Sequence, residues 1–326
     1  MSAGERSNLT GTVIDGRYRI GRRIGIGGTG VVFDAERLSD GHMVVIKTLR
    51  PCFLDHPDLG RRLRREAEVA RNVAHPGIVP VIDEGTMEDG SPYIIMEKVH
   101  GESLSRILLR RNTLRADETA LIAMRVASIL HAAHLQGYTH RDVKPEHVLL
   151  DRDDRNQLVV HLLDFGVCAS PTAPSDERQR EEGRVFGTPS YVSPEQASGE
   201  PNVDGRADLF SLGILMYECL SGRPPFRASN VANLLLRIIR EDAPPLALAA
   251  EHIPFGITEV VHRALMREPD GRFASARAMS RALVPFVADR AAVEMHLASQ
   301  LHIDGQAAPN TPTVHAQASV VTEVAA

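Results

Sequence analysis

The pattern of apolar and polar positions divides the chain into a front part and a back part. Between residues 18 and 50, apolar residues alternate with polar ones in "YRIGRRI", "VVFDAER" and "HMVVIKTL", with glycines and an "SDG" turn between these runs. Alternation with a period of two is typical of short strands joined by tight turns. A helical pattern follows at residues 58–73, and the apolar runs "IVPVID" and "YIIMEKV" predict two further strands.

From residue 116 the pattern is mostly helical, beginning with "DETALIAMRVASILHAAHLQ". Short strands are predicted at residues 148–150 and 159–163, and a loop rich in proline and charge at 170–184. Further helices are predicted at "ADLFSLGILMYECL", "VANLLLRIIR", "ITEVVHRALM" and "ARAMSRALVPFV". After about residue 290 the chain is rich in Ala, Gln and Thr, which predicts a loosely ordered tail. A strand-rich front joined to a helix-rich back predicts an α+β protein with two lobes.

Composition narrows the class of protein. The 326 residues are 43% hydrophobic and 24% charged, as in a globular protein with a substantial core. The net charge of −5 gives no general attraction to nucleic acid, so we expect no nucleic-acid partner. No stretch approaches about 18 uncharged apolar residues, which predicts that the chain does not span a membrane. Three separated cysteines, Cys52, Cys168 and Cys219, form no CxxC pair, which favours a reducing, cytoplasmic location.

A cluster of glycines interrupts the first strands at "GIGGTGVV". Gly25, Gly27 and Gly30 would let backbone amides approach an anion that side chains would exclude. The same letters occur in dinucleotide-binding folds, but there a helix follows, whereas here "VVFDAERL" continues as a strand. The pattern therefore indicates a hairpin that covers an anion, with an ordinary glycine-rich hairpin as the alternative.

A lysine ends the apolar strand "MVVIK". Once buried, the Lys47 ammonium needs an anionic partner, and Glu66 on the following helix offers one. Two alternatives stay open: Lys47 reaches water at a strand edge, and the "RRLRREAEVAR" helix is a solvated face held by its own salt bridges. The arginines of this helix do not indicate nucleic acid, because acidic residues lie among them.

Six segments occur in the order and spacing of a known family: "GIGGTGVV", "VVIK", "HRDVKPEH", "LLDFG", "GTPSYVSPEQ" and "DGRADLFSLG". Over roughly residues 18–288 the chain resembles the eukaryotic-like protein kinases, and most of all the bacterial Hanks-type Ser/Thr kinases. The resemblance implies a small, antiparallel, β-rich N-lobe at about 18–99 and a larger, mostly helical C-lobe at about 100–288. Residues 1–17 would then be an N-terminal extension, and residues 289–326 the loosely ordered tail.

The resemblance also implies ATP as the phosphoryl donor and Mg²⁺ as the metal ion. It makes Asp142 the catalytic base, with Lys144 near the transferred phosphoryl group, and it makes Asp164 a metal ligand. Lys47 would hold the α- and β-phosphates and pair with Glu66. Further ATP contacts are implied at Ile24, Gly25, Ile26, Gly27, Gly28, Thr29, Gly30, Val31, Val32, Val45, Met96, Glu97, Val99 and Leu149.

The resemblance extends to the segment that seats the substrate. Thr188 matches the residue that marks specificity for Ser and Thr over Tyr. Glu195 matches a glutamate that pairs with an arginine, and that arginine is Arg272 in "EPDGRF".

The usual activating phosphorylation site is missing from the sequence. In this family a phosphate on a threonine shortly before "GT" often pairs with the arginine that is Arg141 here. No Ser or Thr lies at positions 176–186, and Glu181 and Glu182 are found there instead. A carboxylate has less charge and fewer acceptor oxygens than a phosphate, so these residues would imitate it in part. The alternative is a solvated run of charges on a loop.

Three residues depart from the family pattern. His147 is found where the family has a metal-binding asparagine, and a neutral imidazole suits hard Mg²⁺ less well than Mn²⁺. Alternatively, His147 only holds the loop through a hydrogen bond to Asp142. Val45 replaces an alanine above the adenine ring and is expected to narrow the pocket. Ala70 replaces a larger apolar residue and is expected to leave its helix loosely packed.

The sequence therefore predicts a cytoplasmic Ser/Thr protein kinase that transfers the γ-phosphoryl group of ATP to hydroxyl groups of protein substrates. Catalysis is favoured because the family's essential charged residues are all present: Lys47, Glu66, Asp142 and Asp164. The first alternative is a pseudokinase that binds nucleotide or a partner without efficient transfer, which His147 favours. The second is a small-molecule phosphotransferase, against which "GTPSYVSPEQ" argues because it resembles a platform for protein substrates.

Overall fold

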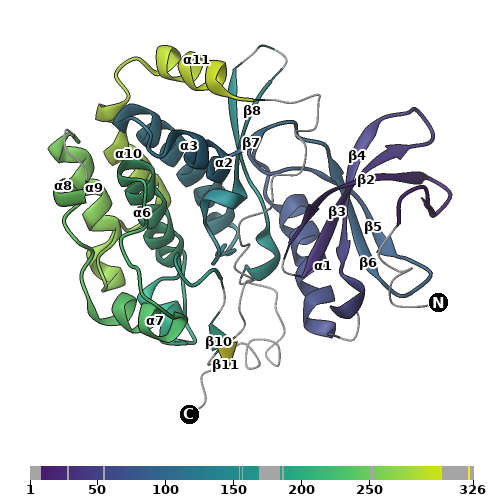
Figure 1. Cartoon of the computed structure of the whole chain (residues 1–326), viewed down its shortest axis with the longest axis horizontal. Helices are drawn as coiled ribbons and strands as arrows, with labels where there is room; N and C mark the ends of the chain where they lie inside the picture. Colours follow the sequence, from purple (N-terminus) through teal and green to yellow (C-terminus); the bar gives the residue numbers. More distant parts are fainter. Residues whose placement is uncertain are drawn as a thin grey trace. The chain divides into compact units, whose positions relative to one another are not determined.

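The computed structural model describes residues 9–27, 29–53, 56–153, 155, 157–168, 184–185, 187–249, 253–302 and 322–323. These residues form two units. The first unit holds residues 9–74 and 79–99, and the second holds residues 75–78 together with the described residues from 100 onward. Figure 1 shows a sheet with helix α1 in the first unit and mostly helices in the second. The prediction of an α+β fold is confirmed.

A six-stranded antiparallel sheet makes up most of the first unit, in the order β1-β2-β3-β4-β6-β5. Its strands are β1 (Val13–Ile14), β2 (Tyr18–Ile26), β3 (Gly30–Arg37), β4 (Met43–Leu49), β5 (Val81–Thr86) and β6 (Pro92–Glu97). Between β4 and β5 the chain forms the single-turn 3₁₀ helix η2 (Pro51–Phe53) and then α1 (Pro57–Asn72).

The two faces of this sheet are covered differently. One face carries a buried apolar core: Ile14, Tyr18, Ile20, Phe33, Ala35, Val44, Ile46, Tyr93 and Ile95. Because successive side chains of a strand point to opposite faces, Val45 and Lys47 lie on the other face. Helix α1 packs on that second face, where Leu63 and Ala67 contact Ile94 of β6. The alternation read from the sequence therefore sets which strand residues face α1.

The second unit is mostly helical. Its helices are α2 (Leu104–Arg111), α3 (Ala116–Leu135), α5 (Pro194–Ala197), α6 (Arg206–Ser221), α7 (Val231–Arg240), α8 (Leu246–Ala249), α9 (Phe255–Ala264), α10 (Ala276–Leu283) and α11 (Arg290–Gln300). Nearly every residue of α6 is buried, as expected for a helix that is apolar on all sides. Helix α3 packs against α6, α10 and α11, so α3 and α6 form the centre of this unit.

Short strands and single turns complete the second unit. β7 (Glu102–Ser103), β8 (Val148–Arg152) and β9 (Leu158–Leu162) form a three-stranded antiparallel sheet, and β10 (Arg184–Val185) pairs with β11 (Thr322–Glu323). The 3₁₀ turns are η3 (Pro145–His147), η4 (Phe165–Val167), η5 (Pro269–Gly271) and η6 (Val284–Phe286). Among the described residues, no helix is both long and apolar enough to cross a membrane.

Prolines shift two element boundaries from where the sequence pattern places them. The run "IVPVID" predicts a strand from residue 78, but β5 begins at Val81. Pro80 has no N–H group to donate to a strand ladder, so the strand starts after it. The helical run from residue 276 ends at Leu283, because Pro285 cannot continue the α-helical hydrogen bonds and η6 forms instead.

The expectation of a loosely ordered tail from residue 289 is wrong for its first part. Residues Arg290–Gln300 form α11, which lies beside α3 (Figure 1). The side chain of Asp289 caps the first turn of the helix, and Val293 and Leu297, four residues apart, are buried. The Ala- and Gln-rich composition hid an apolar spacing that is sufficient for a packed helix.

Candidate active site

Lys47 and Glu66 form the ion pair that the sequence suggested. Lys47 lies on β4, opposite Val32 of β3 and Ile94 of β6, and its Nζ atom is 2.6 Å from Glu66 Oε2. Helix α1 turns Glu66 toward the sheet because Leu63, one turn earlier on the same side, is buried against Ile94. Both charged side chains are largely buried, so each stabilises the other's charge.

The glycine-rich hairpin joins β2 to β3. Its described residues are Ile24, Gly25 and Ile26 at the end of β2, Gly27 and Thr29 in the turn, and Gly30, Val31 and Val32 at the start of β3. Gly28 lies outside the described residues. A Cβ atom at Gly30 would lie 3.2 Å from the main-chain oxygen of Thr48 and 3.9 Å from Lys47 Cε. A side chain at position 30 would therefore press on the backbone of β4 beside Lys47, which favours glycine there.

The strand next to Lys47 leads to the residues expected at the adenine edge. Val45 of β4 is buried and pairs with Met96 of β6, and Met96 packs against the apolar residues of α1. Strand β6 ends at Glu97, whose N–H donates to the main-chain oxygen of Pro80 (3.0 Å). Val99 is the last residue of the first unit that the structure describes.

In the second unit, a buried carboxylate fixes the backbone before Asp142. Asp208 on α6 is fully buried and accepts hydrogen bonds from the N–H groups of His140 (2.9 Å) and Arg141 (2.8 Å). His134 Nε2 lies 2.7 Å from the same carboxylate. Burial alone would raise the pKa of Asp208, but its hydrogen bonds and the neighbouring histidines lower the pKa overall. Asp208 is therefore an anion that holds the loop in place.

Asp142 lies in a closed set of hydrogen bonds. Its Oδ1 atom accepts from Thr188 N (2.7 Å), and its Oδ2 atom accepts from Lys144 Nζ (2.9 Å). Lys144 Nζ also donates to Thr188 Oγ1 (2.6 Å), so the three residues hold one another. Gly187 has φ +105°, and a Cβ there would lie 2.6 Å from the main-chain oxygen of Arg141. Only glycine lets the chain reach Asp142 at this point.

His147 lies between Asp142 and Asp164. Its Nδ1 atom is 2.9 Å from the main-chain oxygen of Asp142, and because that oxygen can only accept, Nδ1 carries the proton. The lone pair is then on Nε2, which is 3.5 Å from Asp164 Oδ2. Burial lowers the pKa of His147 to about 4, and the charge of Lys144 acts in the same direction. The ring is therefore neutral at pH 7 and offers one nitrogen lone pair beside a carboxylate.

Asp164 is presented by a strained turn. Its backbone is left-handed (φ +65°) where β9 gives way to η4. The next residue, Phe165, is buried with its ring edge-on to His140 at 4.5 Å between centroids, and His140 Nε2 lies 3.1 Å from the main-chain oxygen of Leu163. These contacts fix the turn, while the Asp164 side chain itself is 41% exposed. The carboxylate can thus meet a ligand that arrives from solvent.

A divalent metal ion fits Asp164 and His147. Within the described part of the chain there is no group of three His, Cys, Asp or Glu side chains that could hold a metal alone. Mg²⁺ at phosphoryl-transfer sites needs fewer, because it binds one or two carboxylates together with phosphate oxygens and water. The Nε2 lone pair of His147 suits Mn²⁺ better than Mg²⁺.

Arg272 and Glu195 form a buried, fully satisfied ion pair. Arg272 Nη1 and Nη2 donate to Glu195 Oε1 (2.7 Å) and Oε2 (2.8 Å). The remaining N–H groups donate to the main-chain oxygens of Met266, Arg206 and Arg267. All five donors of the guanidinium are used. The pair connects the turn η5 to helix α5, and α5 begins a few residues after Thr188 in the chain.

Comparison with known proteins decides the family. The model of the protein kinase domain matches residues 18–283. The chain belongs to the protein kinase family. It is 33% identical over 308 residues to the Ser/Thr-protein kinase PknH of Mycobacterium bovis, covering 92% of this chain and 50% of PknH. It is 34% identical over 286 residues to the Ser/Thr-protein kinase pkn3 of Myxococcus xanthus, covering 87% and 52%.

A solved kinase domain shares the fold. The crystal structure of a variant of the Mycobacterium tuberculosis PknI kinase domain has a TM-score of 0.66 and 28% sequence identity, covering 86% of this chain and all of that one. The resemblance to bacterial Ser/Thr kinases is thereby confirmed. This kinase chain spans about half the length of the curated relatives that it matches.

The residues expected to serve the kinase reaction are divided between the units. In the first unit are the glycine hairpin, Val45, Lys47, Glu66, Met96, Glu97 and Val99. In the second unit are Arg141, Asp142, Lys144, His147, Leu149 on β8, Asp164, Thr188, Glu195 and Arg272. Glu181 and Glu182 lie outside the described residues.

The kinase site also depends on residues that the sequence analysis did not single out. Asp208 lies within the quoted segment "DGRADLFSLG", yet its two hydrogen bonds to the loop before Asp142 were not foreseen. His134, 74 residues earlier in the chain, was not foreseen either. A signal was present, because an aspartate inside an otherwise apolar helix must find partners once it is buried. The spacing alone does not say which partners these are.

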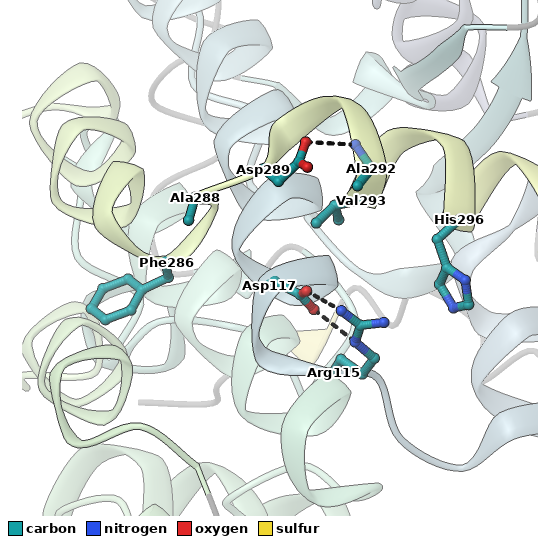
Figure 2. Close-up of a pocket in the computed structure, with 8 residues that line it drawn as sticks. All are labelled: Arg115, Asp117, Phe286, Ala288, Asp289, Ala292, Val293 and His296. Carbon is teal, nitrogen blue, oxygen red and sulfur yellow. Dashed lines mark hydrogen bonds and ion pairs between the residues drawn. The ribbon is translucent and has the colours of Figure 1, made fainter.

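A separate hollow of about 500 Å³ lies between the start of α3, η6 and α11 (Figure 2). It shares no lining residue with the kinase site. Its charged groups are already paired, since Arg115 donates to Asp117 and the Asp289 side chain caps α11. His296 also lines the hollow, and its Nε2 atom lies 3.5 Å from the buried carboxylate of Glu118. We assign this hollow no part in phosphoryl transfer.

Proposed function

We propose that this protein kinase transfers the γ-phosphoryl group of ATP to Ser and Thr hydroxyls of protein substrates. The main observation behind this proposal is the arrangement of Asp142, Lys144 and Thr188. The buried carboxylate of Asp142 has a fixed orientation and lies beside the ammonium group of Lys144. Phosphoryl transfer needs a group that takes the hydroxyl proton and positive charge near the transferred group. The names of PknH and pkn3, both Ser/Thr-protein kinases, support the substrate class.

In this proposal Asp142 accepts the proton of the substrate hydroxyl. Lys144 and the N–H of Thr188 hold its carboxylate in one orientation, so the accepting lone pair needs no reorganisation during the reaction. Lys144 also places positive charge where negative charge develops on the transferred group. Lys47, kept in place by Glu66, would hold the α- and β-phosphates, and the glycine hairpin would offer them main-chain N–H groups.

Asp164 and His147 are the protein ligands for the metal ion in this proposal. A bound Mg²⁺ or Mn²⁺ neutralises and orients the phosphates. The main-chain oxygen of Asp142 keeps the His147 proton on Nδ1, and burial keeps the ring neutral, so Nε2 stays available as a ligand. A nitrogen ligand favours Mn²⁺ over Mg²⁺, so Mn²⁺ is the better activator of this kinase.

The proposal extends to boundaries and setting. The kinase domain takes in residues 18–288, with the N-lobe at about 18–99 and the C-lobe at about 100–288, which the family match at 18–283 supports. The kinase works in the cytoplasm on protein substrates, and nucleic acid is not a partner. The burial of Cys168 and Cys219 as thiols and the net charge of −5 support this setting.

A nucleotide-binding pseudokinase is the second candidate, and His147 is the observation that favours it. Replacing the expected amide oxygen with a ring nitrogen weakens the site for Mg²⁺, the ion that kinases generally use. The pseudokinase would bind ATP and transfer no phosphate with either metal ion.

The test is transfer of labelled phosphate from ATP to a generic basic protein, in Mg²⁺ and in Mn²⁺. Asp142→Asn removes the proton acceptor and should lower the rate at least about a hundredfold, while ATP affinity stays within about twofold. The matched control is Asp153→Asn, which changes the same charge in an exposed loop and should transfer at the wild-type rate. Transfer that survives Asp142→Asn would remove Asp142 from the mechanism. ATP binding without any transfer by the wild type would favour the pseudokinase.

A further inference from the structure

A second carboxylate lies on the sheet face that carries Lys47. Val32 and Asp34 are two residues apart on β3, and Val32 pairs with Lys47 while Asp34 pairs with Val45. Because side chains alternate along a strand, Asp34 shares the face of Val45 and Lys47 rather than that of the apolar core. Its side chain is only 8% exposed. A carboxylate at such a position requires partners.

The partners of Asp34 come from two directions. The ammonium group of Lys98 lies 2.9 Å from Asp34 Oδ1, and Nε of Arg22 donates to Asp34 Oδ2 at 3.1 Å. The Lys98 contact is one of charge rather than of hydrogen-bond geometry, because Oδ1 accepts no hydrogen bond within the described residues. Lys98 is 20% exposed and Arg22 is 59% exposed. Solvent screens the Lys98 pair less, so it is the stronger of the two.

Lys98 is the first residue after the pairing of β6 with β4 has ended. The pairing of β4 with β6 ends at Val44 and Glu97. The carboxylate of Glu97 is itself held from outside β6, with Oε2 2.9 Å from His42 Nε2. The next residue, Lys98, is tied to β3 by its side chain. Beyond Glu97, where strand pairing has stopped, the ion pair of Lys98 with Asp34 therefore attaches the chain to the sheet.

We propose that Asp34 is a positioning residue for nucleotide binding. Through Lys98 it fixes the backbone of Glu97 and Val99, the residues expected at the adenine edge of ATP. The inference rests on the proposed function. A segment ordered before ATP arrives does not have to be ordered by ATP, so affinity is higher. The transferred phosphoryl group is at the other end of the nucleotide. Loss of the contact should therefore raise the KM for ATP and leave kcat at saturating ATP unchanged.

The experiment compares Asp34→Asn, Lys98→Met and the double variant in the full chain. We measure ATP affinity by displacement of a fluorescent ATP analogue, then kcat and KM for ATP, and the melting temperature. Both single variants should weaken ATP binding about tenfold, and the double variant should bind no more weakly than either, because each single variant already removes the contact between Asp34 and Lys98. The control is Glu36→Gln on the same strand, whose partner Arg19 and own side chain are both about half exposed. Its ATP affinity should equal that of the wild type.

Lys98→Arg keeps the charge and should restore wild-type affinity, which a purely structural disturbance of the strand would not do. If Asp34→Asn lowers the melting temperature too far, the comparison of Lys98→Met with Lys98→Arg decides, since that side chain reaches solvent. Unchanged ATP affinity in Lys98→Met, or a fall in kcat with KM unchanged, would overturn the inference. A wild-type chain that binds no ATP would instead overturn the proposed function.

Discussion

His147 differs from asparagine in the kind of atom that it turns toward Asp164. An asparagine would supply a hard amide oxygen, whereas the protonated Nδ1 of His147 leaves only a nitrogen lone pair on Nε2. Mg²⁺ prefers oxygen ligands, and Mn²⁺ tolerates imidazole. The choice of metal ion is therefore expected to depend on one ring atom.

His147→Asn is expected to raise the transfer rate in Mg²⁺ on the order of tenfold and to change the rate in Mn²⁺ by less than about twofold. The measurement is kcat/KM for ATP in each metal ion. His262→Asn is the control, because it makes the same change in α9, where the His262 ring accepts a hydrogen bond from Leu246 N. Equal responses in both metal ions would show that His147 is not a metal ligand.

The charged residues of the site could be predicted from the sequence, and several of their partners could not. Lys47, Asp142 and Asp164 lie in short segments whose spacing is specific to the kinase family. The contact of Asp34 with Lys98 joins residues 64 positions apart, and no local pattern announces it. Strand alternation places Asp34 on a face, but only the folded sheet brings Lys98, the residue after β6, within reach of Asp34 on β3, with β4 between the two strands.

At the scale of elements, the pattern predicted the helices and strands with strong periodicity and missed four short helices of the described chain, α2, α5, α8 and α11. α2 and α11 have eight and eleven residues, so few apolar positions are available to show a period. α11 is held by contacts with distant segments: Arg125 Nη2 of α3 lies 2.6 Å from Glu294 Oε1, and Arg110 donates to the main-chain oxygen of Gln300. Such helices are stabilised by packing more than by their own propensity.

Leu297→Ala tests whether α11 belongs to the core of the second unit. Leu297 is 1% exposed, so truncation should lower the free energy of unfolding by about 2–4 kcal/mol, measured by urea denaturation. Met295→Ala, on the same helix, removes a side chain that is 70% exposed. It should change the free energy of unfolding by less than about 0.5 kcal/mol. Equal effects of the two variants would mean that α11 does not pack on α3 in solution.

At the scale of the whole molecule, the sequence leads us to expect that activation depends on residues 169–183, which lie outside the described part of the chain. Their sequence lacks Ser and Thr where the activating phosphate usually occurs and has Glu181 and Glu182 instead. Protein prepared without any phosphorylation should therefore be as active as protein preincubated with ATP. The double variant Glu181→Ala, Glu182→Ala should lower the rate several-fold, because it removes the carboxylates that are expected to imitate the activating phosphate.

One outcome of this experiment would contradict the role expected of Glu181 and Glu182. A marked gain in rate on phosphorylation of Ser170, Thr172 or Ser175, with the two glutamates dispensable, would contradict a built-in acidic switch. Phosphate content followed by mass spectrometry alongside the rate distinguishes the two cases.

Because all five donors of Arg272 are used, few substitutions are tolerated at this position during evolution. Lysine carries its donors on one atom and cannot serve oxygens spread around a planar guanidinium, so it is no substitute at position 272. Loss of Glu195 would leave a buried cation unpaired, and loss of Arg272 would leave a buried anion unpaired. Mutations arrive one codon at a time, and each first step away from this pair is costly. Substitutions at positions 195 and 272 are therefore expected to be retained only when both residues change together.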